Sequence, residues 1–248
     1  MYNLSGKTIS ILGASTSTFD GFSNSAQYNS TLTINPTYFP RVGLVSDVSD
    51  TWWMKTIKEL DLRLCVNNSW SGSCVTIKSD ELEKAACMIR SAQLHNDNLN
   101  IEPDIIILMI GGNDALRGYD VGPYNGICDV YDESSQSYIG DCTLFGQAYA
   151  TMVHKVKNRY PNADVFVCSM LHWKPRNHNK DLPQYNDVIK KIAEEFKLAY
   201  IDLYNETEIS PETEQLYLHG DGIHPNKIGF SQMSDCVVGT LKKYFQNH

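Results

Sequence analysis

Four short segments of the sequence hold residue types that are used in nucleophilic catalysis. They are GAS at 13–15, NNSWSG at 67–72, GGND at 111–114 and DGIHP at 221–225. A serine hydroxyl becomes an effective nucleophile when a neighbouring base takes its proton, and histidine titrates near neutral pH. We therefore interpret Ser15 as a nucleophile and His224 as its base.

The other polar residues of these segments suit a transition state that carries negative charge. Asp221 lies three residues before His224, so a short turn would bring its carboxylate to the imidazole Nδ1–H. A carbonyl under attack needs hydrogen-bond donors in an oxyanion hole. We expect these donors to be the backbone N–H groups of Ser15 and Gly72 and the side-chain amide of Asn113. Glycine allows close backbone approach, and an asparagine amide donates without carrying a charge.

The elements that must position these residues alternate along the chain. Nearly continuous apolar runs predict buried strands at 8–12, 62–66, 104–110, 163–170 and 198–203. Amphipathic stretches predict helices at 51–60, 80–95, 143–160, 184–197 and 226–245. Such alternation indicates right-handed crossovers and a parallel sheet covered by helices on both faces.

The predicted fold is α/β, a three-layer α/β/α arrangement with a flavodoxin-like, five-stranded parallel sheet. We expect one domain over residues 1–248, with long insertions at about 19–50 and 117–142. Both insertions begin shortly after a predicted strand, at the sheet edge where open α/β folds bind their ligands. Loops of this length are usually functional or disordered.

The four segments, in this order, resemble the blocks of the SGNH hydrolases, also called GDSL-type lipases, esterases and acylhydrolases. Ser15 matches the nucleophile of that family, and Asp221 and His224 match its D-x-x-H pair. Gly72 and Asn113 match its oxyanion glycine and asparagine. One position departs from the family pattern, because Ala14 stands where the family usually has aspartate. The family takes its triad acid from D-x-x-H, so the resemblance still implies an esterase with a Ser-His-Asp triad.

The substrate is expected to be a short acyl ester, most simply an acetyl ester, on a sugar or oligosaccharide. The two insertions are polar and aromatic and lack a continuous aliphatic stripe; their aromatic residues include Tyr28, Tyr38, Phe39, Tyr119, Tyr124, Tyr131 and Tyr138. Aromatic faces suit pyranose rings, whereas a lipase groove needs a broad apolar surface. His172 and Trp173 follow the fourth predicted strand and are expected to contact substrate. A lysophospholipase or thioesterase acting on longer acyl chains is the alternative.

Three other interpretations remain open from sequence alone. Ser15 could be a helix N-cap, since serine is favoured there. The hydroxyl-rich turn after the first strand could hold a phosphate in a flavodoxin-like binding module. A noncatalytic relative that binds glycans is a further alternative, supported only by Ala14.

The composition of the chain limits the classes of partner that we expect it to bind. The net charge of −8 gives no sign of nucleic-acid binding, and no apolar run approaches the length of a membrane span. We expect no cofactor and no metal, because the six-residue spacing of His172 and His178 fits no common zinc pattern. No basic and apolar leader is visible at the start of this sequence, and seven cysteines are an odd count; both favour the cytoplasm, with a secreted mature form as the alternative. Whether Cys128 and Cys142 pair, and the oligomeric state, stay open.

Overall fold

The centre of the molecule is a five-stranded parallel sheet. The computed structural model describes residues 4–23, 37–41, 44–77, 84–122, 124, 126–127, 142–173 and 182–247. The strands are β1 (Thr8–Gly13), β2 (Arg63–Ser69), β3 (Ile105–Met109), β4 (Asp164–Cys168) and β5 (Ala199–Ile201). Their order across the sheet is β2-β1-β3-β4-β5, and each neighbouring pair is parallel. All five carboxyl ends therefore meet at one edge of the sheet.

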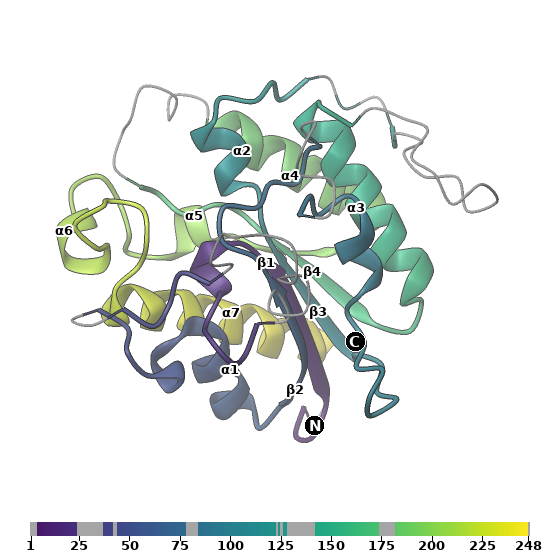
Figure 1. Cartoon of the computed structure of the whole chain (residues 1–248), viewed down its shortest axis with the longest axis horizontal. Helices are drawn as coiled ribbons and strands as arrows, with labels where there is room; N and C mark the ends of the chain where they lie inside the picture. Colours follow the sequence, from purple (N-terminus) through teal and green to yellow (C-terminus); the bar gives the residue numbers. More distant parts are fainter. Residues whose placement is uncertain are drawn as a thin grey trace.

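Helices cover both faces of this sheet (Figure 1). On one face α1 (Trp52–Leu60) packs against α7 (Lys227–Asn247), and on the other α3 (Phe145–Arg159) packs against α4 (Leu182–Phe196). Two short helices follow strand ends, α2 (Gly112–Leu116) after β3 and α5 (Leu203–Glu206) after β5, and the short α6 (Glu214–Tyr217) lies between α5 and α7 in the chain. The predicted three-layer α/β/α fold is confirmed.

The apolar patterns correctly locate the core. Every residue of β1 is buried, as expected for a strand covered on both faces. The side chains of Trp52 and Trp53 are also fully buried, so α1 anchors its first turn in the core. That helix begins where the Thr51 hydroxyl accepts a hydrogen bond from the N–H of Met54, the usual N-cap arrangement.

The predicted helix over residues 80–95 is wrong within the residues that the structure describes. From residue 84 onward this segment contains only a short 3-10 helix, Ile89–Ala92. The backbone N–H groups of Ala86 and Cys87 donate to the carbonyls of Cys74 and Val75 instead of to their own preceding turn. Because these N–H groups are bonded to another segment, the intrahelical hydrogen bonds cannot form there.

The cysteines fall into two groups. Cys65, Cys87, Cys168 and Cys236 are buried free thiols, as predicted, and the buried sulfur of Cys74 accepts a hydrogen bond from Arg117 at 2.8 Å. Cys142 is disulfide-bonded, and its partner is not among the described residues. A Cys128–Cys142 disulfide would involve Cys128, which lies outside the described residues, so that pairing stays open.

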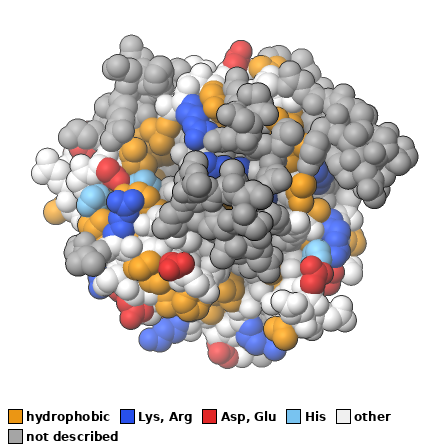
Figure 2. Space-filling model, in the orientation of Figure 1, with side chains coloured by type: hydrophobic (Ala, Val, Ile, Leu, Met, Phe, Trp, Pro, Cys, Tyr) orange, Lys and Arg blue, Asp and Glu red, His pale blue; other side chains and the backbone are white. Residues whose placement is uncertain are grey.

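The described surface mixes polar and apolar side chains. On the face shown in Figure 2, charged groups of both signs lie among hydrophobic ones. Among the described residues, no helix has the length and hydrophobicity that a membrane crossing requires.

Candidate active site

The carboxyl edge of the sheet brings the four sequence segments together. Strand β1 ends at Gly13, where an added Cβ would lie 2.8 Å from atoms of Ser17 and Ser69. Only glycine fits at this position. The chain turns directly after it, and Ser15 is the first residue of a 3-10 helix, Ser15–Ser17. The cap position of that helix is Ala14, so the interpretation of Ser15 as an N-cap is wrong.

Three predicted residues form one hydrogen-bonded series. The Nε2 atom of His224 lies 2.8 Å from Ser15 Oγ, and its Nδ1 atom lies 2.7 Å from Asp221 Oδ2. The other oxygen of Asp221 accepts hydrogen bonds from the backbone N–H groups of Ile223 at 2.8 Å and His224 at 3.0 Å. The turn from 221 to 224 thus fixes the carboxylate against the imidazole.

The electrostatics of this series favour a neutral histidine beside an ionised aspartate. Burial raises the pKa of Asp221, but hydrogen bonds from Tyr38, His224 and Ile223 outweigh it and hold the pKa well below its usual range. Burial lowers the pKa of His224, and Asp221 partly opposes that effect. Because Asp221 is a carboxylate, Nδ1 of His224 carries the proton, and Nε2 accepts from the Ser15 hydroxyl.

Asn113 lines the same cavity as Ser15, whereas Gly72 does not. Asn113 is in α2, directly after β3, and together with Ser15 it lines a cavity at this edge. Gly72 has a φ of +72°, in the left-handed region that favours glycine, and its carbonyl accepts from Arg117 at 3.1 Å. Gly72 is not among the residues that line the cavity, so its predicted role as a donor stays a prediction.

Two residues that sequence reasoning missed brace these loops. The buried carboxylate of Asp114 accepts from the N–H groups of Val75 at 2.9 Å and Thr76 at 3.0 Å, which ties the GGND turn to the loop after β2. Its place beside Asn113 was the available signal. The fully buried Arg90 donates to the carbonyl of Gly13 at 2.7 Å, next to the nucleophile turn. No local pattern marks Arg90 in the sequence.

The cavity beside Ser15 is small and mostly apolar. It measures about 70 Å³ and is lined by Ala14, Ser15, Thr16, Met109, Ile110, Gly112, Asn113, Leu116, Ser169, Met170, Leu171, Trp173, Leu203 and Ile223. Trp173 is thus placed at the cavity, and its role as a substrate contact stays a prediction. His172 does not line it and instead stacks on Tyr204, with ring centroids 3.6 Å apart.

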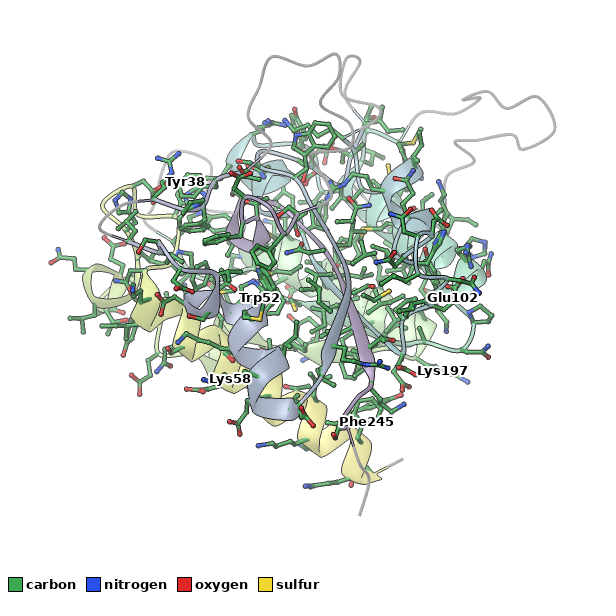
Figure 3. The ribbon with its side chains drawn as sticks, turned by 60° about the horizontal axis from the view of Figure 1, so that its bottom comes forward. Tyr38, Trp52, Lys58, Glu102, Lys197 and Phe245 are labelled. Atoms are coloured by element: carbon green, nitrogen blue, oxygen red, sulfur yellow. The ribbon has the colours of Figure 1, made fainter. Side chains whose placement is uncertain are left out.

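The described part of the first insertion also reaches the site. The ring of Tyr38 stacks on the imidazole of His224, with centroids 3.6 Å apart and planes at 14°. Tyr38 is labelled at the upper left of Figure 3, toward the carboxyl edge of the sheet. Of the other aromatic residues named for the two insertions, Tyr28, Tyr131 and Tyr138 lie outside the described residues, as does His178. Within the described ranges, no three histidine, cysteine, aspartate or glutamate side chains gather as metal ligands would.

Comparison with known proteins agrees with this geometry. The sequence model of the GDSL-like Lipase/Acylhydrolase family matches residues 7–241. The chain belongs to this family. The predicted resemblance is therefore confirmed, and the chain carries a domain of a lipase and acylhydrolase family. Family membership decides against the flavodoxin-like binding module.

Solved structures show the same fold. A GDSL-like lipase from Bacteroides ovatus ATCC 8483 superimposes with a TM-score of 0.69 at 27% identity, over 96% of this chain and 99% of that one. An acetylxylan esterase from Geobacillus stearothermophilus superimposes with a TM-score of 0.58 at 18% identity, over 97% and 96% of the two chains. At that identity the second likeness shows the fold alone.

One curated relative of this GDSL-like chain is much longer. A multidomain esterase from Ruminococcus flavefaciens is 24% identical over 147 residues. The match covers 58% of this chain but 16% of that protein. The shared region is thus a small part of the relative.

Proposed function

We propose that the chain is a serine esterase that removes a short acyl group, most simply acetyl, from a carbohydrate ester. The observation that carries the proposal is the continuous series of hydrogen bonds from Ser15 through His224 to Asp221. This arrangement has the geometry of a nucleophile, a base and an orienting carboxylate.

The proposed reaction proceeds through an acyl-enzyme. His224 Nε2 takes the Ser15 hydroxyl proton as Oγ bonds to the ester carbonyl carbon, and the C–O bond to the alcohol breaks as His224 returns that proton to the leaving oxygen. A water molecule then attacks the acyl-enzyme and gives a proton to His224, and His224 returns that proton to Ser15 Oγ as the bond between Oγ and the acyl carbon breaks and the carboxylic acid leaves. The negative carbonyl oxygen accepts hydrogen bonds from the Ser15 and Gly72 N–H groups and from Asn113.

The size of the cavity supports a short acyl group. Since about 10–15 Å³ of such space accommodates one water-sized group, 70 Å³ has room for a few non-hydrogen atoms. An acetyl group fits within that space, whereas an octanoyl chain would have to extend beyond it. The named activity of the structural relative from Geobacillus stearothermophilus, an acetylxylan esterase, points to the same class of substrate.

The alcohol side of the substrate is proposed from the aromatic residues around the site. The stacked pair of His172 and Tyr204 lies in the segments that follow β4 and β5, and in the sequence these two residues come next to Leu171 and Leu203 of the cavity wall. Stacked rings offer flat faces of the kind that cover pyranose rings, so this pair is our proposed sugar contact.

A chain-length series tests the proposal. p-Nitrophenyl esters from acetate to octanoate should show kcat/KM falling with length, and acetylated xylan fragments should release acetate. A preference for octanoate, or for an acyl-CoA, would assign the site to longer acyl chains instead.

The nucleophile is tested separately. Ser15→Ala should abolish hydrolysis, and a fluorophosphonate should label the wild-type enzyme once, at Ser15. Ser17→Ala is the matched control, because Ser17 lies in the same turn but contacts Trp52 and Met109. Labelling at another serine, or full activity of Ser15→Ala, would contradict the proposed triad.

A further inference from the structure

Tyr38 contacts two members of the proposed triad at once. Its ring covers one face of the His224 imidazole, at a centroid distance of 3.6 Å. Its hydroxyl donates a hydrogen bond of 2.6 Å to Asp221 Oδ2, the same oxygen that faces His224 Nδ1. The base and its carboxylate are therefore both held by a single side chain from the first insertion.

The backbone of Tyr38 is tied to the nucleophile turn. Its N–H donates to Thr18 Oγ1 at 2.8 Å, and that hydroxyl donates to the carbonyl of Ser15, also at 2.8 Å. The neighbouring Phe39 is 1% exposed and packs edge-on against Phe230 of α7. This buried residue fixes Tyr38 to the same scaffold as the triad.

Arg41 lies on the outer face of the same ring. Its guanidinium carbon is 3.8 Å from the Tyr38 ring centroid, and its Nε donates to the Tyr38 carbonyl at 3.0 Å. Arg41, Tyr38 and His224 therefore form a stack of three planar groups. The positive charge of Arg41 faces the imidazole through the tyrosine ring.

We propose that Tyr38 is a positioning residue for His224, and that Arg41 opposes protonation of His224 from the outer face of the same ring. This inference rests on the proposed function, in which His224 is the base for Ser15. The stack prevents the imidazole from turning away from Ser15 Oγ and keeps water from one of its faces. The hydrogen bond from the Tyr38 hydroxyl stabilises the negative charge of Asp221, which weakens the attraction between that carboxylate and the Nδ1 proton of His224.

Four groups act on the charge of His224 from the elements around it. Asp221 favours the imidazolium, while Arg41 and His219 disfavour it. Tyr38 stays a neutral phenol, because burial and the bond to Asp221 raise its pKa. Removing the phenol hydroxyl or the Arg41 charge should therefore make His224 easier to protonate. The acid limb of kcat/KM should then move to higher pH.

Three variants separate the ring, the hydroxyl and the charge. Tyr38→Phe keeps the stack and should lower kcat by roughly twofold to tenfold, through the lost bond to a charged group. Tyr38→Leu also loses the stack and should lower kcat by roughly 10- to 100-fold, because a misplaced base is costly. Arg41→Met keeps the length of the side chain and should leave kcat within about twofold. Both Tyr38→Phe and Arg41→Met should move the acid limb up by about half a pH unit, with KM for p-nitrophenyl acetate little changed.

Matched controls lie at the opposite edge of the sheet. Tyr244→Phe removes a phenol–carboxylate bond of 2.9 Å to Asp164, and Arg159→Met removes a guanidinium over the ring of Tyr160. Neither control should move the pH profile. Thermal melts of all variants check folding, and if Tyr38→Leu does not fold, the profile of Tyr38→Phe carries the test.

The possible results separate this inference from the function on which it rests. If Ser15→Ala retains activity, the proposed triad fails and the role of Tyr38 fails with it. If Ser15→Ala is inactive but the profiles of Tyr38→Phe and Arg41→Met coincide with wild type, the positioning role alone is overturned. A raised KM with unchanged kcat and profile would also overturn it, since Tyr38 would then be a substrate contact.

Discussion

The side-chain amide of Asn113 donates one hydrogen bond to the carbonyl of Ser73, at 2.8 Å. An asparagine amide has two N–H donors, so this bond fixes the plane of the group and leaves its second N–H for another acceptor. Asn113 also lines the cavity beside Ser15. The loop after β2 thus orients a donor that belongs to the turn after β3.

Asn113→Ala should therefore damage the chemical step more than substrate binding. Loss of one oxyanion donor typically costs about 3–4 kcal/mol of transition-state stabilisation, which corresponds to a fall of roughly 100- to 1,000-fold in kcat. KM should change little, because the donor acts mainly on the developing charge. Steady-state kinetics with p-nitrophenyl acetate measure both constants, with Asn158→Ala on the outer surface of α3 as the control. Equal kcat in the two variants would remove Asn113 from the oxyanion hole.

The pH dependence of kcat/KM should show one acid limb below the ordinary histidine pKa. Burial lowers the pKa of His224, so the free enzyme keeps a neutral base down to pH values below about 6.5. Activity should be level around neutral pH and should fall as the pH drops through the lowered pKa. A profile in buffers of constant ionic strength measures this limb. A midpoint above 7 would contradict the assignment of His224 as a buried base.

Asp114→Asn should destabilise the fold. The carboxylate accepts three hydrogen bonds, from the N–H groups of Val75 and Thr76 and from the Thr76 hydroxyl at 2.7 Å. An amide nitrogen in place of one oxygen would face a donor, so the free energy of unfolding should fall by about 1–3 kcal/mol. Urea denaturation measures this, and the exposed Asp187→Asn should show no comparable loss.

The same carboxylate should make stability depend on pH in the acidic range. Burial raises the pKa of Asp114 to about 6, against the hydrogen bonds from Val75 and Thr76 that lower it. Between about pH 4 and 6 the folded chain therefore holds a proton that the unfolded chain has lost. The contribution of Asp114 to the free energy of unfolding should thus decrease as the pH rises through this window. In Asp114→Asn this contribution should be absent, which a comparison of the two unfolding curves across that range would show.

Trp173→Leu should widen the acyl preference. Trp173 lines the cavity beside Ser15, and a smaller side chain leaves room for a longer acyl group. The ratio of kcat/KM for butyrate to that for acetate should rise by roughly tenfold, the scale of one or two methylenes in an apolar pocket. Trp53→Leu is the matched control, since both indole N–H groups are buried without a hydrogen-bond partner among the described residues. If both variants shift the ratio equally, the cavity does not hold the acyl group.

The parallel sheet was predictable because its strands are almost continuously apolar. The run from Ile105 to Met109 needs cover on both faces, and helices must alternate with such strands to provide it. The positions of Ser15, Asp221 and His224 followed from their places after strands and from the short D-x-x-H spacing. These features are local in the chain, or repeat along it.

Contacts between distant segments were not predictable in the same way. The helix predicted over 80–95 is absent from residue 84 onward because the backbone N–H groups of Ala86 and Cys87 donate hydrogen bonds to carbonyls in the loop after β2. Tyr38 was noted as one aromatic among several, because its partner Asp221 lies 183 residues away. Arg90 looks like an ordinary basic residue until the carbonyls that it binds are known. In each case a long-range contact overrides or supplements the local pattern.

The separation of Ser15 and His224 has a consequence for the synthesis of the chain. The two side chains meet at 2.8 Å although 209 positions divide them. A ribosome translating this region makes the turn that carries the serine directly after β1, but the imidazole emerges only after the other four strands have also been made. A growing polypeptide therefore holds an unactivated hydroxyl until that point, and nascent chains cannot cleave esters before the segment leading into α7 has docked.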